Sequence, residues 1–189
     1  MKAEASIVKQ YEYADFEKRV DIMLENFASF TARIDICYEA IKYRIKEDRA
    51  FARRQDKGDP GIRVQSSGTG SPTEREALEN IEIEEALKEK DFSGTVFKDV
   101  DDVDAIKREI YIIEIMKLDF QALEKQMKVL KEKDRKILKD YLGDCMGLEE
   151  IAEAENMPYE TIRTRIKRAK ARVKREMVCF LNENGRREI

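Results

Sequence analysis

Histidine and tryptophan are absent from the 189-residue sequence, and proline, glycine and cysteine are scarce, with three, eight and three residues. Without histidine the chain lacks the most frequent general base and metal ligand of proteins, and Ser-His and Cys-His nucleophiles are excluded. Cys37, Cys145 and Cys179 lie far apart with no CxxC spacing, so neither a zinc site nor a disulfide framework is expected. We predict no catalytic, cofactor-binding or metal-binding residues, and no enzymatic activity.

Long apolar runs are also missing from the sequence. None approaches the ~20 residues that a membrane-spanning helix needs. The N-terminal stretch MKAEASIVKQYEYADFEKR has no hydrophobic segment of the signal-peptide kind. We therefore expect a soluble, cytoplasmic protein that makes no contact with membranes.

The charges are distributed unevenly along the chain. Residues 159–176 contain eight basic residues and two glutamates, which gives a net charge of +6, while residues 177–189 have a net charge of zero. Because the whole chain carries −3, the first 158 residues carry −9. An acidic body with one basic segment near its C-terminus indicates a localised docking surface for an acidic partner such as nucleic acid.

The scarcity of glycine and proline favours an all-α fold. Apolar residues in the first part of the chain recur in alternating steps of four and three, which is a heptad seam. The seam consists of Phe16, Val20, Met23, Phe27, Phe30, Ile34, Cys37 and Ile41. It predicts a long N-terminal helix within residues 1–55, with Phe27 and Phe30 buried. Either an intramolecular helical hairpin or a homodimeric coiled coil through this seam accounts for the pattern.

Residues 56–71 contain four glycines and a proline, and we predict a flexible linker there. Ser71, Pro72 and Glu74 form a helix-starting pattern. A helical middle region, residues 72–130, follows and is expected to pack on the N-terminal helix. Its cluster of aspartates between residues 99 and 104 lacks the glycine of a calcium loop, so we expect these carboxylates to cap a helix near residue 103.

Residues 131–180 are predicted to form a DNA-binding domain, followed by a tail at 181–189. A short helix with Leu148, Ile151 and Ala152 on its apolar face leads to a turn at Asn156 and Met157. A second helix then places four apolar side chains on one face, at Ile162, Ile166, Ala169 and Val173. Asparagine tolerates the left-handed backbone that such a turn needs. The pattern is typical of a helix-turn-helix.

The second helix is the predicted recognition helix, because its polar face carries groups that read or bind DNA. The residues assigned to base edges are Tyr159, Glu160, Arg163, Thr164 and Lys167. The residues assigned to phosphates are Arg165, Arg168, Lys170 and Arg172.

The sequence LEEIAEAENMPYETIRTRIKRAKARVKRE resembles the region-four helix-turn-helix of bacterial sigma factors, and the preceding LKEKDRKILKDYL resembles that family's leading helix. The order of segments is further similar to RinA/ArpU-type phage late-gene transcriptional regulators. The resemblance implies a regulator of phage or prophage genes that binds promoter DNA in a bacterial host cell. It also implies RNA polymerase as a partner, with a docking surface that we assign to Leu138, Tyr141 and Leu142 or to the neighbouring helix.

Three other functions stay open from the sequence. A phage small terminase subunit also combines a helix-turn-helix with helical oligomerisation segments, and it assembles into rings. A sigma-like factor is a second alternative, although the chain shows no region-two motif for melting promoter DNA. The third is a coiled-coil interaction protein whose basic helix binds an acidic partner.

Overall fold

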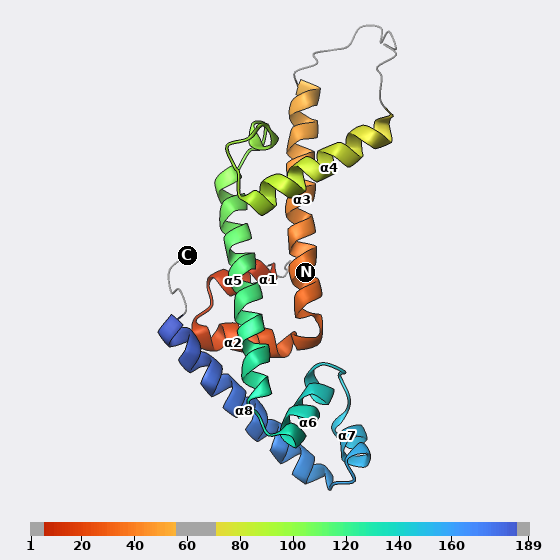
Figure 1. Cartoon of the computed structure of the whole chain (residues 1–189), viewed down its shortest axis with the longest axis vertical. Helices are drawn as coiled ribbons and strands as arrows, with labels where there is room; N and C mark the ends of the chain where they lie inside the picture. The colour runs from red at the N-terminus through yellow and green to blue at the C-terminus, as the bar shows by residue number, and fades with distance from the viewer. Residues whose placement is uncertain (1–5, 56–70, 185–189) are drawn as a thin grey trace, which may run out of the picture. The chain divides into compact units, whose positions relative to one another are not determined.

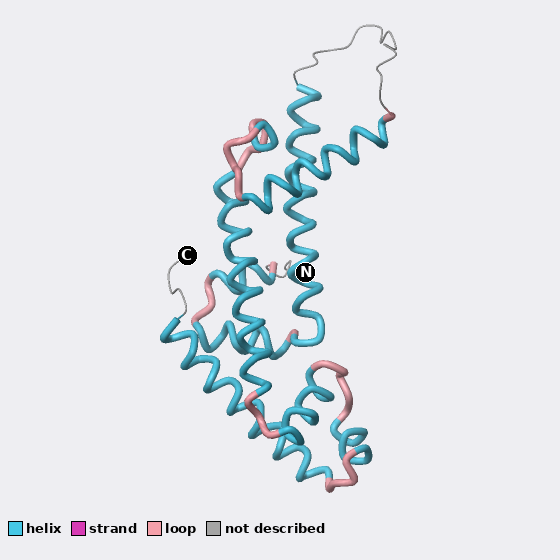
Figure 2. The backbone as a smooth tube through the Cα atoms, viewed as in Figure 1, coloured by secondary structure: helices cyan, strands magenta, loops and turns pink. Residues whose placement is uncertain are grey.

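A computed structural model describes residues 6–55 and 71–184 of the chain, and most of these residues are helical (Figures 1 and 2). Within those two ranges there is no strand. The helices are α1 (Ile7–Glu12), α2 (Phe16–Glu25), α3 (Phe30–Gln55), α4 (Pro72–Glu89), α5 (Val103–Lys128), α6 (Glu132–Leu142), α7 (Leu148–Ala154) and α8 (Tyr159–Asn184), with short 3-10 turns η1 (Phe27–Ser29) and η2 (Thr95–Phe97). The prediction of an all-α fold that ends in a helix-turn-helix is confirmed. None of the described helices is both long enough and apolar enough to span a membrane.

The N-terminal segment is not the single long helix that its heptad pattern predicts. The long continuous helix is limited to α3, because Asp15 starts a separate helix, α2, and Asn26 ends it. The Asp15 carboxylate accepts a hydrogen bond from the Lys18 backbone N–H at 2.8 Å and so caps the start of α2. The Asn26 side chain donates to the Ile22 carbonyl at 2.8 Å, just where α2 ends. Asp15 precedes the first residue of the seam, Phe16, whereas Asn26 ends the helix inside the seam, where the apolar periodicity predicts that the helix continues.

The predicted seam is buried within one chain. Its buried members are Phe16, Val20, Met23, Phe30, Ile34 and Ile41. Phe27 and Cys37 are half-buried, so the expectation of a fully buried Phe27 is wrong. Since these side chains are already covered by other parts of the same chain, the seam offers no free apolar surface to a second copy. Homodimerisation through this seam therefore has no support in the structure.

The predicted linker at residues 56–71 lies outside the described residues, except for Ser71. Ser71 has an extended backbone and is the N-cap of α4, which starts at Pro72 as predicted. The Ser71 hydroxyl makes no capping hydrogen bond to the helix. At the start of α5, the Asp102 carboxylate accepts from the Ala105 backbone N–H at 2.9 Å, so one of the clustered aspartates caps this helix as expected.

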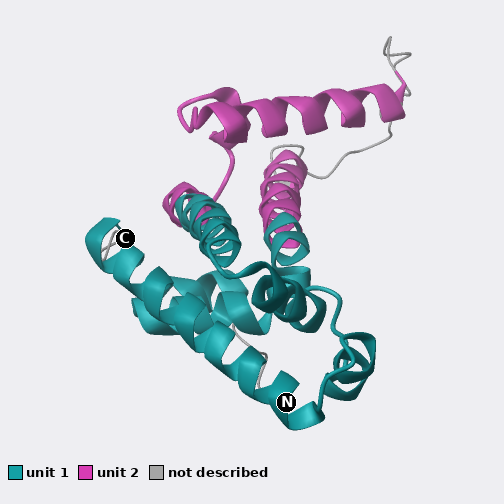
Figure 3. Cartoon of the chain, turned by 60° about the horizontal axis from the view of Figure 1, so that its bottom comes forward, with its two compact units in different colours: residues 1–35, 111–189 teal, residues 36–110 magenta. Residues whose placement is uncertain are grey.

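The chain divides into two compact units (Figure 3). Unit 1 contains the described residues of 1–35 and 111–189, and unit 2 consists of the described residues of 36–110. Residues 131–180, which we predicted as a separate domain, thus share unit 1 with the N-terminal helices, because α2 packs against α8. The predicted middle region 72–130 is divided between the two units.

Unit 2 has a small apolar core enclosed by ion pairs. The buried apolar side chains are Ile41, Ile45, Ile83, Leu87, Val96, Phe97, Val100, Ile106 and Ile110. The Arg44 guanidinium binds the Glu109 carboxylate through two hydrogen bonds, of 3.1 and 2.5 Å. Glu79 of α4 accepts a second pair of contacts, from Arg53 at 2.7 Å and Arg49 at 3.4 Å. These pairs tie α3 to α4 and to the start of α5.

Candidate nucleic-acid interface

The turn between α7 and α8 is closed by backbone hydrogen bonds. The Met157 N–H donates to the Ala152 carbonyl at 3.0 Å, and the Glu155 N–H donates to the Ile151 carbonyl at 3.0 Å. Asn156 adopts a left-handed backbone with φ of 51°, as the sequence predicts for this position. The Pro158 carbonyl then accepts from the Thr161 N–H at 2.9 Å, which starts the next helix. The chain reverses its direction within a few residues.

The helix-turn-helix packs on an apolar stripe of α8. Ile162, Ile166, Ala169 and Val173 are all buried, which confirms the predicted spacing. Helices α6 and α7 both pack against α8, and Figure 1 shows the three helices around the turn. The Ile151 side chain of α7 is fully buried as well. The opposite face of α8 is consequently left to solvent.

Most of the nine residues assigned to DNA lie on that solvent face. Six of them are charged or hydroxyl side chains that are exposed, and Tyr159 is exposed by 41%. These six are Glu160, Arg163, Thr164, Lys167, Arg168 and Arg172. Lys170 and Arg165 are half-buried. All nine belong to one helix and follow directly on the turn.

Two of the assigned arginines are engaged in ion pairs. Arg165 lies 3.5 Å from the Asp134 carboxylate of α6, and this contact ties α6 to α8. Arg163 lies 3.6 Å from Glu160, one turn earlier on the same helix. In contrast, no ion pair with a described residue is formed by four other cations, Lys167, Arg168, Lys170 and Arg172. Within the described residues, none of the four lies within ion-pair distance of a carboxylate, although the Arg172 charge adds to the Arg175 hydrogen bond in lowering the pKa of Glu176.

One exposed cation of α8 is absent from the predicted set. Arg175 continues the row of Thr164, Arg168 and Ala171, at steps of four, three and four residues, which keeps it on the same helix face. Its side chain is exposed, and its guanidinium donates to the Glu176 carboxylate at 2.8 Å. Extending the same helical spacing by one step would have found it from the sequence.

The C-terminal half of α8 is covered by the N-terminal helix α2. Met177 and Leu181 are buried there. The Lys174 ammonium group donates to the Asp21 carboxylate of α2 at 2.8 Å. This hydrogen bond raises the pKa of Lys174, and the nearby carboxylates of Glu17 and Asp15 act in the same direction. Lys174 is therefore held by its own chain.

A buried polar cluster fastens α1 and α2 to α5. The Tyr11 hydroxyl donates to the Asp119 carboxylate at 2.7 Å, and the buried Arg19 guanidinium lies 5.2 Å from the Tyr11 ring centroid. The Arg19 Nε also donates to the Ala14 carbonyl at 3.2 Å. Burial raises the pKa of Asp119, while the Tyr11 hydrogen bond and the Arg19 charge partly offset the rise. Burial and the Asp119 charge raise the pKa of Tyr11, which keeps its proton and stays the donor.

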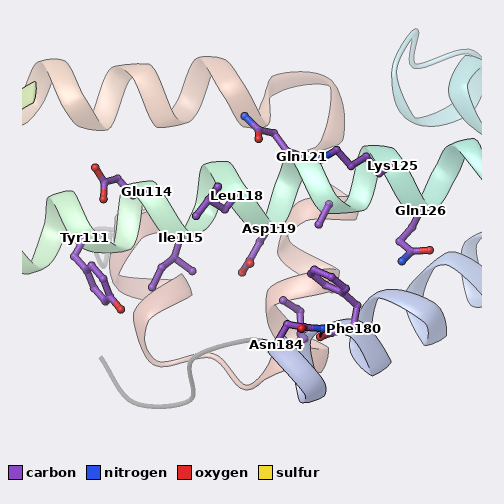
Figure 4. Close-up of a pocket in the computed structure, with 12 residues that line it drawn as sticks. Tyr111, Glu114, Ile115, Leu118, Asp119, Gln121, Lys125, Gln126, Phe180 and Asn184 are labelled. Carbon is purple, nitrogen blue, oxygen red and sulfur yellow. Dashed lines mark hydrogen bonds between the residues drawn. The ribbon is translucent and has the colours of Figure 1, made fainter.

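A groove lies between α5 and the last turns of α8 (Figure 4). It has a volume of about 580 Å³, and its walls include Leu118, Phe180 and Asn184, with Asp119 at its edge. Phe180 lies eight residues beyond Arg172, the last residue assigned to DNA, which is about 12 Å along the helix axis. The groove therefore lies beyond the C-terminal end of the face assigned to DNA, and no feature of the sequence predicted it.

The predicted polymerase-docking residues are unsuited to that role. Leu138 and Leu142 are buried in unit 1, and Tyr141 is half-buried. The reason is that the apolar face of α6 packs against α7 and α8. Leu138 and Leu142 stabilise the helix-turn-helix from inside, and only Tyr141 of the three keeps part of its surface exposed.

Comparison with known protein families bears on the segment that contains this turn. Residues 120–173 match the family Sigma-70, region 4. This region-four segment (residues 120–173) contains the last turns of α5, all of α6 and α7, and α8 as far as Val173. That family is a DNA-binding domain, and the match supports a sigma-region-four-like helix-turn-helix in this segment. Curated proteins and solved structures gave no match.

The region-four segment is bounded on both sides by contacts with the N-terminal part of the chain. At its first residue, the Phe120 ring stacks on Phe30 with 4.8 Å between centroids and contacts Phe27 at 5.2 Å. Directly after its last residue comes Lys174, which binds Asp21. The N-terminal helices therefore support the region-four segment at its two edges and leave its basic face open.

Proposed function

We propose that this protein is a sequence-specific DNA-binding transcriptional regulator whose recognition helix is α8. The observation that carries the proposal is a group of cations that form no ion pair with a described residue, on a helix that follows a tight turn; they are Lys167, Arg168, Lys170 and Arg172. A recognition helix presents its N-terminal residues to base edges in the major groove, while flanking cations bind phosphates. The match of residues 120–173 to the Sigma-70, region 4 family supports the same role.

The assigned residues divide into two groups in this proposal. Tyr159, Glu160, Arg163, Thr164 and Lys167 read base edges near the start of α8. Arg168, Lys170 and Arg172 bind phosphates, and Arg165 does so from the border with α6. There its ion pair with Asp134 holds the guanidinium in place. Phosphate contacts set the register of the helix, and the base contacts give the sequence preference.

We further propose that the regulator acts on phage or prophage promoters in the bacterial cytoplasm, together with RNA polymerase. The first 158 residues carry −9, and the long-range attraction to DNA comes from one helix. Such a small interface loses much of its affinity at physiological salt, because each phosphate contact releases counterions. A second contact, to polymerase on the same promoter, raises the effective affinity by about 10²–10⁴.

A small groove between α5, α6 and η1 has the chemistry for the polymerase contact. Its volume is about 380 Å³, and Phe27 and Met127 contribute apolar surface. Lys128, Arg135 and Lys139 supply three positive charges against the single carboxylate of Glu124. An apolar floor with a basic rim suits an acidic, apolar segment of a partner protein. This groove replaces the buried residues of α6 as the proposed docking surface.

The test is a gel-shift titration of the full chain at physiological salt, using DNA selected by the protein from random sequences. We expect weak binding by the protein alone and binding tighter by about 10²–10⁴ when bacterial RNA polymerase is present. Lys139→Glu should remove most of that gain without changing binding in the absence of polymerase. Lys133→Glu, at an exposed position outside the groove, is the matched control. Equal, nanomolar affinity with and without polymerase would contradict the shared promoter contact and leave a self-sufficient DNA-binding protein.

A further inference from the structure

Unit 2 exposes an apolar face on α3 that its core does not use. Ile36 and Tyr43 are 67% and 66% exposed, and Ala40 lies between them at steps of four and three residues. They face away from Ile41 and Ile45, which are buried in the core. The three side chains help to line a groove of about 630 Å³, whose other walls include Lys42 and Lys46. Exposed apolar surface with a polar rim is typical of an interaction site.

The other long helix of unit 2, α4, carries a similar apolar pair on its outer face. Leu78 and Ile81 are 56% and 52% exposed, while Ile83 and Leu87 on the opposite face are buried. Glu74 and Glu85 extend the pair in both directions, so that Glu74, Leu78, Ile81 and Glu85 follow steps of four, three and four residues. This spacing matches that of Ile36, Ala40 and Tyr43. Such stripes pack together when helices interdigitate their side chains.

The two faces have opposite charge. Residues 36–55 of α3 carry six cations against three carboxylates, whereas α4 carries seven glutamates against Arg75 and Lys88. Lys46 beside the groove, and Glu85 on α4, form no ion pair with a described residue. Lys42 is held by Glu39 at 2.6 Å. The α3 groove, where Lys46 forms no ion pair with a described residue, and the outer face of α4, with Glu74 and Glu85, are thus complementary in charge.

From this complementarity we infer that unit 2 is a self-association surface whose occupant is a second copy of the chain. The outer face of α4 in one copy packs into the α3 groove of the other copy, and twofold symmetry repeats the contact in the opposite direction. Leu78 and Ile81 cover Ile36 and Tyr43, and Lys46 faces Glu85 of the second copy. The inference concerns unit 2 alone, and it does not depend on the proposed DNA-binding function.

The oligomeric state of the full chain is the first test. Sedimentation velocity over a range of concentrations should give a particle of twice the 22.1 kDa chain mass. Ile36→Glu should raise the dimer dissociation constant at least about tenfold, because it places a buried, unpaired charge at the contact. Leu118→Glu is the matched control, since Leu118 is 64% exposed on α5 in unit 1. Circular dichroism of each variant verifies that it is folded.

A charge exchange tests the pairing itself. Lys46→Glu and Glu85→Lys each place two like-charged contacts in the twofold dimer, and each should weaken it about threefold to tenfold. An equimolar mixture of the two variants should form a heterodimer of wild-type strength, because both contacts then join opposite charges. A pair within one chain cannot produce this recovery.

Four results would overturn the inference. The first two are a monomeric wild-type chain and a ring of many subunits of the kind that packaging proteins form. The third is dissociation of the dimer by Leu118→Glu and not by Ile36→Glu. The fourth is a mixture of the two charge variants that dimerises as weakly as either variant alone.

Discussion

The two halves of α8 belong to one continuous helix but have different neighbours. In the first half, residues 159–172, the buried stripe faces α6 and α7, and most of the cations are exposed, while Arg165 pairs with Asp134 of α6. In the second half, α2 covers the helix, Met177 and Leu181 are buried, and Lys174 binds Asp21. A basic residue on this helix is therefore free for a partner only where no acidic segment of the chain lies over it.

The carboxylates at and near α2 explain why Lys174 is held in an ion pair while Arg172, on the same helix, is not. Glu17 and Asp21 lie on this helix, and Asp15 caps it. Their carboxylates raise the pKa of Lys174, whereas no ion pair with a described residue is formed by Arg172, two positions earlier. The chain thus neutralises part of its own basic helix. The face proposed to bind DNA borders on the contact with α2, although the exposed Arg175 continues it beyond Lys174.

The largest expected effect comes from a substitution in the C-terminal half of α8, which packs against α2. Met177→Ala should lower the free energy of unfolding by about 2–5 kcal/mol, because the truncation leaves a cavity at a fully buried position. A urea titration measures the change in midpoint. Phe180→Ala, at a partly exposed position one turn later, should cost clearly less. If Met177→Ala left the midpoint unchanged, α2 would not pack on α8 as described.

A smaller effect is expected at the base-reading end of the other half. Arg163→Ala should reduce affinity for the selected DNA by about 1–3 kcal/mol and relax the preference at one base pair. Its ion pair with Glu160 is exposed and contributes little to folding, so stability should stay nearly constant. Quantitative binding to a set of single-base variants of the site measures both effects. An equal loss on selected and random DNA would show that Arg163 reads no base.

The smallest effect compares Arg172 with Lys174, two cations separated by one residue. Arg172→Ala should reduce the slope of log affinity against log salt by about one unit on every DNA sequence. Lys174→Ala should leave that slope unchanged and lower stability by at most about 1 kcal/mol, since its pair with Asp21 is partly exposed. Fluorescence anisotropy at several salt concentrations gives both slopes. Equal slopes for the two variants would mean that the ion pair of Lys174 with Asp21 does not separate it from Arg172 in DNA binding.

The helix-turn-helix could be predicted from the sequence because its signals are local. Ile162, Ile166, Ala169 and Val173 follow the helical period, and all four are buried. Asn156 marks the left-handed residue of the turn and has a positive φ. A residue that must adopt a special backbone conformation leaves a compositional signature whatever packs around it. The assignment of individual side chains to bases and phosphates remains a prediction.

The N-terminal helices could not be predicted with equal success, because apolar periodicity does not register breaks. The steps of four and three continue from Phe16 to Ile41, yet Asn26 ends α2 within this range by a hydrogen bond with the backbone. The same ambiguity affects α6, where an apolar face is compatible with either a core or a docking surface. Burial of Leu138 and Leu142 decides for the core. The apolar period of a sequence identifies one face of a helix, but it does not show which other segment of the chain packs against that face.

The sequence by itself determined that the protein is helical, where the turn before α8 lies, and that positive charge gathers on that helix. These properties depend on residue type and spacing over a few turns, which act before any distant contact forms. The tertiary structure alone decided which of those charges stay available. Asp21 and Lys174 are 153 residues apart in the chain, and Tyr11 and Asp119 are 108 residues apart. No local pattern encodes such pairs, because they form only when burial of apolar surface brings distant helices together.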